Sequence, residues 1–215
     1  MPEAAIGLFP DCGASHFLSR LPGFFGEFLG LTGTRLDGFE MVMGGLATHF
    51  VFSKDLASVE EALDSLAASG VLEVSTISET INKYVQEEKL AEQSEEKWIT
   101  NAIKYMKSVS PTSLKIFLRL VREGRMQNLK ECLTHEFRVS CHILRRTVNN
   151  DFYEGGRAML IEKERSKPLW MPSKLELVSD EMVEKYFNEV DDDDDWEPLQ
   201  LPARSSPAYI GLSKL

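Results

Sequence analysis

The sequence has few cysteines, no long apolar run and no basic leader. Its cysteines, Cys12, Cys132 and Cys141, are odd in number and far apart, so the sequence predicts neither a disulfide framework nor a zinc site. This usage favours a soluble protein in a reducing, intracellular compartment. Charges interrupt every apolar stretch before it reaches the ~18 residues of a membrane span. The start, MPEAAIGLFPD, lacks the basic region of a signal peptide.

Acidic residues outnumber basic ones, giving a formal net charge of -10. That balance argues against a nucleic-acid partner and an anionic membrane surface, because phosphates are bound by clustered Lys and Arg. The acidic run at residues 191–195 is typical of a solvated, self-repelling segment, since metal ligands must converge from a rigid frame. We therefore predict no nucleic-acid partner, no membrane partner and no metal, and leave the oligomeric state open.

The last three residues, Ser213, Lys214 and Leu215, form the SKL tripeptide that a peroxisomal import receptor reads at an exposed carboxy terminus. They follow a stretch rich in Pro and Ser, LPARSSPAYIG, which favours an accessible tail. The tripeptide therefore predicts a peroxisomal protein.

The hydrophobic pattern predicts a mostly α chain with a few short strands. Turn residues divide the first 50 residues into short elements, and the run at 47–52 is typical of a buried strand. Helical periodicity dominates from residue 56, with a helix start signal at Ser110-Pro111. We predict three regions, residues 1–55, a helical region 56–187 and an acidic, Pro/Ser-rich tail 188–215. Because a few strand residues cannot form a sheet by themselves, the first region indicates an incomplete domain.

Two carboxylates, Glu3 and Asp11, flank an apolar stretch that contains Gly7, and a turn of small residues follows them. Apolar surroundings raise the pKa of a carboxyl group, which suits it to proton transfer near neutral pH. Their spacing alone is equally typical of two surface acids in a loop.

The segment resembles the crotonase superfamily, and within it the 3-hydroxyisobutyryl-CoA hydrolases. The resemblance continues in order through about residue 187, in blocks such as LSRLPG, LTGTRLDG, LATHFV, SPTSLK and DFYEGGRAMLIEKE. It implies the α/β crotonase spiral, of which this chain is the carboxy-terminal part. It also implies an acyl-CoA substrate, and no separate cofactor because CoA is part of that substrate.

The resemblance assigns the catalytic residues. The family's catalytic glutamate falls on Glu3, in Met-Pro-Glu, and eight residues later the hydrolases carry aspartate, here Asp11, where hydratases and isomerases carry glycine. The implied reaction is hydrolysis of 3-hydroxyisobutyryl-CoA in valine degradation. Both carboxylates would contact substrate, with His16 as a further contact. The family's Gly-Gly-Gly-Tyr is Gly13-Ala14-Ser15-His16 here, which leaves the acyl group open.

The resemblance also places Met1 at an internal methionine of the family and the oxyanion donors before it. We therefore expect residues 1–215 to be a fragment that neither folds stably nor hydrolyses thioesters by itself. Two alternatives stay open: a non-catalytic structural subunit of a larger assembly, such as a mitochondrial ribosome, and an enoyl-CoA hydratase or isomerase, which Asp11 disfavours. Since relatives occur in mitochondria, that compartment is the alternative to the peroxisome.

The other reactive side chains favour structural roles. His49, on the predicted strand, is typical of a satisfied core histidine, and Cys12 has no partner base that would make it a nucleophile. The basic residues near the end of the helical region are compatible with contacts to CoA phosphates or with a solvated helix face: Arg157, Lys163 and Lys167.

Overall fold

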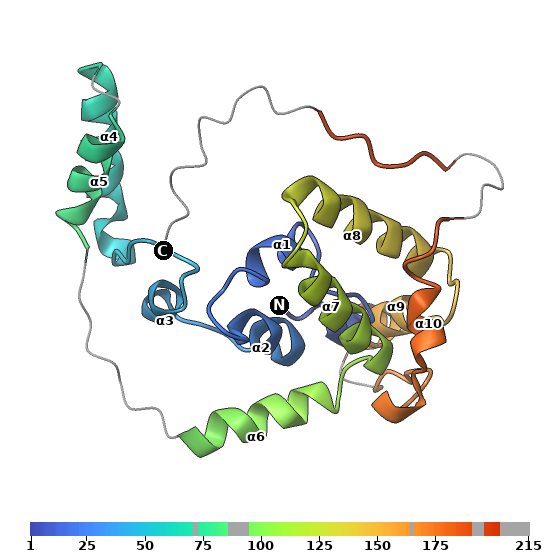
Figure 1. Ribbon diagram of the computed structural model, residues 1–215. Helices are drawn as coiled ribbons and strands as arrows, with labels where there is room; N and C mark the ends of the chain where they lie inside the picture. The colour runs from blue at the N-terminus through green and yellow to red at the C-terminus, as the bar shows by residue number, and fades with distance from the viewer. Residues whose placement is uncertain (71–72, 86–94, 164–165, 191–195, 203–215) are drawn as a thin grey trace. The chain divides into compact units, whose positions relative to one another are not determined.

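The computed structural model describes residues 1–70, 73–85, 95–163, 166–190 and 196–202 (Figure 1). Over these residues the chain consists of helices and loops, as the helical periodicity predicted, and no strand occurs among them. Its contacts form two units, Met1–Arg35 with Ser94–Leu215, and Leu36–Gln93. The boundary predicted at residue 55 lies inside the second unit. The SKL tripeptide and the acidic run lie outside the described residues.

The central helix of the first unit is α7, Pro111–Gly124. It begins where the sequence predicted, with Pro111 in its first turn and the Ser110 hydroxyl accepting a hydrogen bond from Ser113 N at 3.1 Å. Four of its apolar side chains are at most 1% exposed: Ile116, Phe117, Leu120 and Val121. Each such burial contributes about 1.5–3 kcal/mol, so this stripe supplies much of the unit's core.

The helices that pack against α7 include α1 (Ala14–Leu18), α2 (Phe25–Thr32) and α8 (Leu129–Leu144). Glycine allows two of these approaches. A Cβ at Gly124 would lie 2.3 Å from the Ser15 carbonyl oxygen, and one at Gly30 would lie 2.1 Å from the Phe117 ring. Neither position has room for a side chain, so these glycines set the helix spacing.

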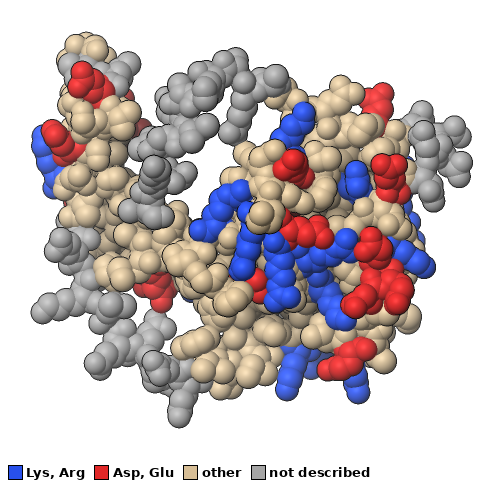
Figure 2. Space-filling view, viewed as in Figure 1, with Lys and Arg blue, Asp and Glu red and all other residues tan. Residues whose placement is uncertain are grey.

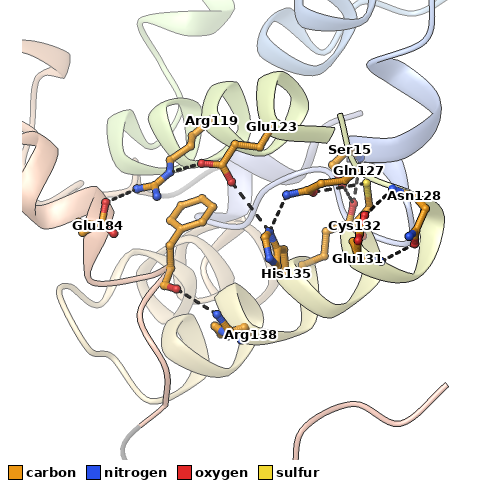
Figure 3. A network of polar contacts seen from close by, with 12 residues as sticks. Ser15, Arg119, Glu123, Gln127, Asn128, Glu131, Cys132, His135, Arg138 and Glu184 are labelled. Atoms are coloured by element: carbon orange, nitrogen blue, oxygen red, sulfur yellow. Dashed lines mark hydrogen bonds and ion pairs between the residues drawn. The ribbon is translucent and has the colours of Figure 1, made fainter. Parts of the chain in front are cut away.

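A polar network joins α7 and α8 to α10, Asp180–Glu184 (Figure 3). Arg119 donates to Glu123 at 2.7 Å and to Glu184 at 2.6 Å, and its guanidinium lies 4.0 Å from the centre of the Phe187 ring. Figure 2 shows Lys and Arg interleaved with Asp and Glu over the face that carries α7. Since its cations are paired within the fold, we interpret this network as packing between helices.

The strand predicted over residues 47–52 is wrong for the described structure. These residues form an extended loop between α3 (Gly38–Met43) and the short helical turn η2 (Ser53–Asp55). The Phe50 ring lies 2.6 Å from where a Cβ on Gly38 would be, and its centroid is 5.3 Å from that of Phe52. An aromatic, β-branched run forms a strand only beside a partner strand, and no described segment pairs with this one.

His49 accordingly does not lie on a strand. It is half-buried, and its Nδ1 is 2.8 Å from the Thr48 hydroxyl. His142 is the histidine that the core encloses: its Nδ1 is 2.9 Å from Thr147 Oγ1, and its Nε2 donates to the Asn188 carbonyl oxygen at 3.0 Å. Both of its ring nitrogens are occupied, which leaves His142 a structural role.

The second unit contains α3, η2, α4 (Leu56–Ala68) and α5 (Val74–Asn82), of which α4 and α5 contact each other. A capping box begins α3: Glu40 N donates to Asp37, and Asp37 N donates to the Glu40 side chain, both at 2.8 Å. The apolar stripe of α4 is half-buried: Val59, Leu63 and Leu66.

The remaining helices of the first unit are α6 (Glu95–Met106), α9 (Asp151–Gly156), the π-helical turn η3 (Arg157–Ile161) and the short turn η5 (Leu175–Leu177). Residues 151–161 are helical throughout, α-helical in α9 and π-helical from Arg157 in η3. The π turn leaves Leu160 and Ile161 more than 70% exposed. No helix within the described ranges is both long and apolar enough to span a membrane.

We predict that Glu154→Gln lowers the urea midpoint of unfolding at pH 7. Hydrogen bonds from Arg157, at 2.6 and 2.8 Å, lower the pKa of Glu154 to about 2 from an ordinary 4.5. A carboxylate whose pKa is lowered by folding stabilises the protein above its unfolded pKa and loses that effect as pH falls through the folded value. The difference between variant and parent should therefore shrink between pH 4.5 and 2. Glu176→Gln, at an exposed site on η5, is the control, and a pH-independent difference would contradict the prediction.

Candidate active site

Glu3 begins the short helical turn η1, Glu3–Ile6. Ala5 N donates to the Pro2 carbonyl at 2.9 Å and Leu8 N to the Glu3 carbonyl at 3.0 Å, so backbone bonds close the turn on both sides. The Glu3 side chain is half-buried, and its Oε2 is buried without a hydrogen-bond partner among the described residues. An acceptor left in that state is free to bind a ligand atom.

Two helices hold η1 in place. On one side, Ser110 N donates to the Ala4 carbonyl at 3.0 Å, and Ala4 packs in a core cluster with Val109 and Leu114. On the other side, a Cβ at Gly155 of α9 would lie 2.4 Å from the Ile6 backbone. The backbone that carries Glu3 is therefore fixed by main-chain contacts.

Gly7 makes the second close contact between η1 and α9. Its φ is +72°, a conformation that favours glycine, and a Cβ there would lie 2.3 Å from the Asp151 backbone. The Asp151 carboxylate in turn accepts from Ser110 Oγ at 2.6 Å and from Met171 N at 2.9 Å. Burial raises the pKa of Asp151, while these two hydrogen bonds act in the opposite direction. This buried carboxylate ties α9 to the start of α7 around η1.

Asp11 follows two buried residues, Phe9 and Pro10, at the end of the same segment. The Asp11 carbonyl accepts from Ala14 N at 3.0 Å, and the next two residues, Cys12 and Gly13, have φ of +56° and +89°. The Asp11 side chain is half-buried. The turn therefore presents Asp11 just before α1.

Glu136 of α8 fixes this turn by accepting hydrogen bonds from it. It is 3% exposed, and its carboxylate accepts from Gly13 N at 2.6 Å, Ser15 N at 2.9 Å and Ser15 Oγ at 2.6 Å. It thereby satisfies backbone N–H groups at the start of α1 that no helical bond can reach. The Ser15 hydroxyl adds a side-chain bond to the two backbone bonds.

Glu136 was not among the residues that the sequence predicted for the site. A signal for it exists, because it lies within the buried stripe of α8 formed by Cys132, Val139 and Ile143. A carboxylate inside an apolar stripe needs a buried donor, and here the donor is the turn that carries Asp11. The sequence does not say which donor that is.

Both predicted carboxylates raise the pKa of the Cys12 thiol. Asp11, through its charge and a hydrogen bond, is the largest cause of the raised pKa of the Cys12 thiol, and the charge of Glu3 raises it further. Glu3 and Asp11 therefore act on the same exposed position. The raised pKa disfavours the thiolate, which agrees with the prediction that Cys12 is not a nucleophile.

His16 lies half-buried on α1, and its contact with a substrate stays a prediction. The Arg157 guanidinium, a candidate contact for CoA phosphates, forms ion pairs with Glu154 and Glu162. Within the described ranges, no three His, Cys, Asp or Glu side chains group so as to hold a metal ion.

The family model for enoyl-CoA hydratase/isomerase matches residues 1–95 and 78–187. The chain is 43% identical over 244 residues to probable 3-hydroxyisobutyryl-CoA hydrolase 2 of Arabidopsis thaliana, covering 100% of this chain and 64% of that protein. The small ribosomal subunit protein mS47 of the same plant is 42% identical, over 97% of this chain and 58% of that protein. The human mitochondrial 3-hydroxyisobutyryl-CoA hydrolase is 36% identical, over 90% and 56%. The chain thus spans less than two thirds of the length of these relatives.

Among solved structures, the chain is similar to a carnitinyl-CoA dehydratase from Mycobacterium thermoresistibile. The TM-score is 0.71 at 29% identity, and the match covers 89% of this chain and 59% of that one. The helical arrangement described above is therefore one that also occurs in that dehydratase.

We predict that Gly155→Ala destabilises the folded protein by about 1–3 kcal/mol, because its methyl group would overlap the Ile6 backbone. The neighbouring Gly156→Ala is the matched control, since a Cβ there meets nothing within 4 Å. The control should be neutral or stabilising by up to about 1 kcal/mol, because alanine is the better helix former. Urea unfolding measures both, and equal effects would show that η1 does not pack on α9 as described.

We predict that Asp11→Asn speeds alkylation of Cys12 severalfold at pH 8. Removing the largest cause of its raised pKa moves the thiol toward its ordinary value of 9.0 and increases the thiolate fraction. A Cys141→Ser background isolates the reaction, because Cys132 is fully buried. The rate with iodoacetamide is measured from pH 7 to 10 with Asp37→Asn as control. A rate profile unchanged by Asp11→Asn would place the carboxylate away from the thiol.

Proposed function

The chain belongs to the enoyl-CoA hydratase/isomerase family, and from that premise we propose that it carries the catalytic carboxylates of an acyl-CoA thioester hydrolase. The observation that supports the proposal is the position of Glu3 and Asp11 at the two ends of one partly buried segment, whose backbone is hydrogen-bonded at both ends. The proposed substrate is 3-hydroxyisobutyryl-CoA, the compound named for the Arabidopsis relative, and the proposed pathway is valine degradation.

Hydrolysis of a thioester adds the oxygen of one water to the acyl carbon and releases CoA as the thiol. Glu3 has two possible roles: attack on the acyl carbon to form a mixed anhydride, or removal of a proton from the attacking water. The unpartnered Oε2 of Glu3 is available for either role. CoA enters and leaves with the substrate, so the proposed reaction uses no separate cofactor.

Asp11 is proposed to position the hydrolytic water and to contact the hydroxyl group of the acyl chain. The bonds from Gly13 and Ser15 to Glu136 support this role, because a rigid turn holds a carboxylate in one geometry.

One observation favours a second function. The relative named small ribosomal subunit protein mS47 is 42% identical to this chain, nearly as similar as the hydrolases. A structural subunit has no need of Glu3 and Asp11, so their presence together favours the enzyme. A hydratase or isomerase is the third candidate, and Asp11 disfavours it.

The compartment is proposed from two signals that differ. The human relative is named mitochondrial, whereas Ser213-Lys214-Leu215 favours import into peroxisomes. Imaging the chain with a fluorescent tag at its amino terminus, with and without Leu215, distinguishes the two.

The hydrolase proposal is tested with the 215-residue chain alone and in a chimera, in which it replaces the matching segment of the Arabidopsis hydrolase. We predict thiol release from 3-hydroxyisobutyryl-CoA by the chimera, and a loss of about 100-fold or more in Glu3→Gln and Asp11→Asn, the usual contribution of an acid–base group. Glu176→Gln is the matched control and should retain full activity.

Three outcomes would overturn this proposal. A folded chimera without thiol release favours the structural subunit. Hydration of an enoyl-CoA without thiol release favours the hydratase. Thiol release that survives both substitutions removes the carboxylates from the mechanism.

A further inference from the structure

Three buried side-chain polar atoms in the described part of the chain lack a hydrogen-bond partner, and two of them belong to neighbouring residues of the candidate site. One is Oε2 of Glu3, and the other is the hydroxyl oxygen of Tyr105, at the end of α6. Leaving such a group unpaired costs about 1–3 kcal/mol, and folded proteins do so rarely. A pair of such atoms therefore calls for a ligand that satisfies both.

The Tyr105 ring is fixed beside η1. It packs on the core cluster of Ala4, Val109 and Leu114, the same cluster that holds the residue after Glu3. Gly33 also lies against the Tyr105 ring: a Cβ there would lie 2.6 Å from Tyr105 Cζ and 2.9 Å from its hydroxyl oxygen. Gly33 has φ of +59°, so both conformation and space require glycine.

The electrostatic environment of Tyr105 includes the charge of Glu3. The pKa of Tyr105 is raised to about 12 by burial and, after it, by the charge of Glu3. The phenol therefore stays protonated at neutral pH and is a hydrogen-bond donor there, not a base. A phenol donor and an acceptor-only carboxylate, each without a partner, select a group that both accepts and donates.

A hydroxyl group is that ligand. It accepts one hydrogen bond through its oxygen and donates another through its hydrogen, as a water or an alcohol does. We propose that Tyr105 is a substrate-contacting residue of the Glu3 site, donating a hydrogen bond to an oxygen whose own hydrogen is donated to Glu3 Oε2.

The inference rests on the proposed thioester hydrolysis, in which two such oxygens exist: the attacking water and the hydroxyl group of the 3-hydroxyacyl chain. In the first case Tyr105 orients the nucleophile, and in the second it selects hydroxylated acyl groups. The chemistry of the contact is the same in both.

The first test needs no activity. The chimera is labelled with ¹³C at tyrosine Cζ, and the Tyr105→Phe variant assigns the Tyr105 signal. This signal should change with pH in the parent chimera, and the change should vanish in Glu3→Gln but persist in Glu176→Gln. A Tyr105 signal that does not respond to pH, or responds equally in Glu3→Gln, overturns the inference.

The second test is kinetic. Tyr105→Phe should lower the kcat for 3-hydroxyisobutyryl-CoA about tenfold, as expected for one lost hydrogen bond. The control is Tyr153→Phe, which removes a phenol that donates to the Leu144 carbonyl instead. An equal loss with isobutyryl-CoA identifies the attacking water, whereas a loss confined to the hydroxylated substrate identifies the acyl hydroxyl group.

The two proposals fail in different ways. If Tyr105→Phe behaves like Tyr153→Phe with both substrates while Glu3→Gln is inactive, the Tyr105 inference is wrong and the hydrolase proposal stands. If the parent chimera does not release thiol, the hydrolase proposal is wrong, and the NMR titration alone decides whether Tyr105 and Glu3 share a site.

Discussion

The close approach of η1 to α9 is the constraint on which the candidate site depends. Gly7 and Gly155 lie where any side chain would overlap the opposite backbone, so the turn that carries Glu3 is held by main-chain contacts on a helix 150 residues away in sequence. The bond from Ser110 N to the Ala4 carbonyl fixes the same turn against α7. Because these contacts involve no catalytic side chain, the Glu3 carboxylate is left free for a ligand.

The turn that carries Asp11 is held by a different kind of contact. Here the contact is a buried charge: the Glu136 carboxylate is paired with two backbone N–H groups and the Ser15 hydroxyl. A buried carboxylate is stabilising only when donors surround it, so the turn and α8 depend on each other. Backbone packing at one end of the segment fixes the turn that carries Glu3, and buried polar contacts at the other end fix the turn that carries Asp11.

Sequence reasoning succeeded where the determinants are local. Ser110 and Pro111 are a helix start whatever packs around them, and α7 begins there as predicted. It failed where a segment depends on a distant partner. Residues 47–52 have strand composition but no described strand beside them, and a ladder of hydrogen bonds needs both strands.

The sequence by itself determined the family, and it predicted the two carboxylates from short motifs: Met-Pro-Glu at Glu3 and the aspartate eight residues later. Only the tertiary structure decided what surrounds them. Glu136 and Tyr105 lie more than 90 residues from the segment that they serve, and each reads in sequence as an ordinary member of a helix. Their roles arise from unpaired or buried polar atoms, and pairing is a property of positions in space that no local pattern encodes.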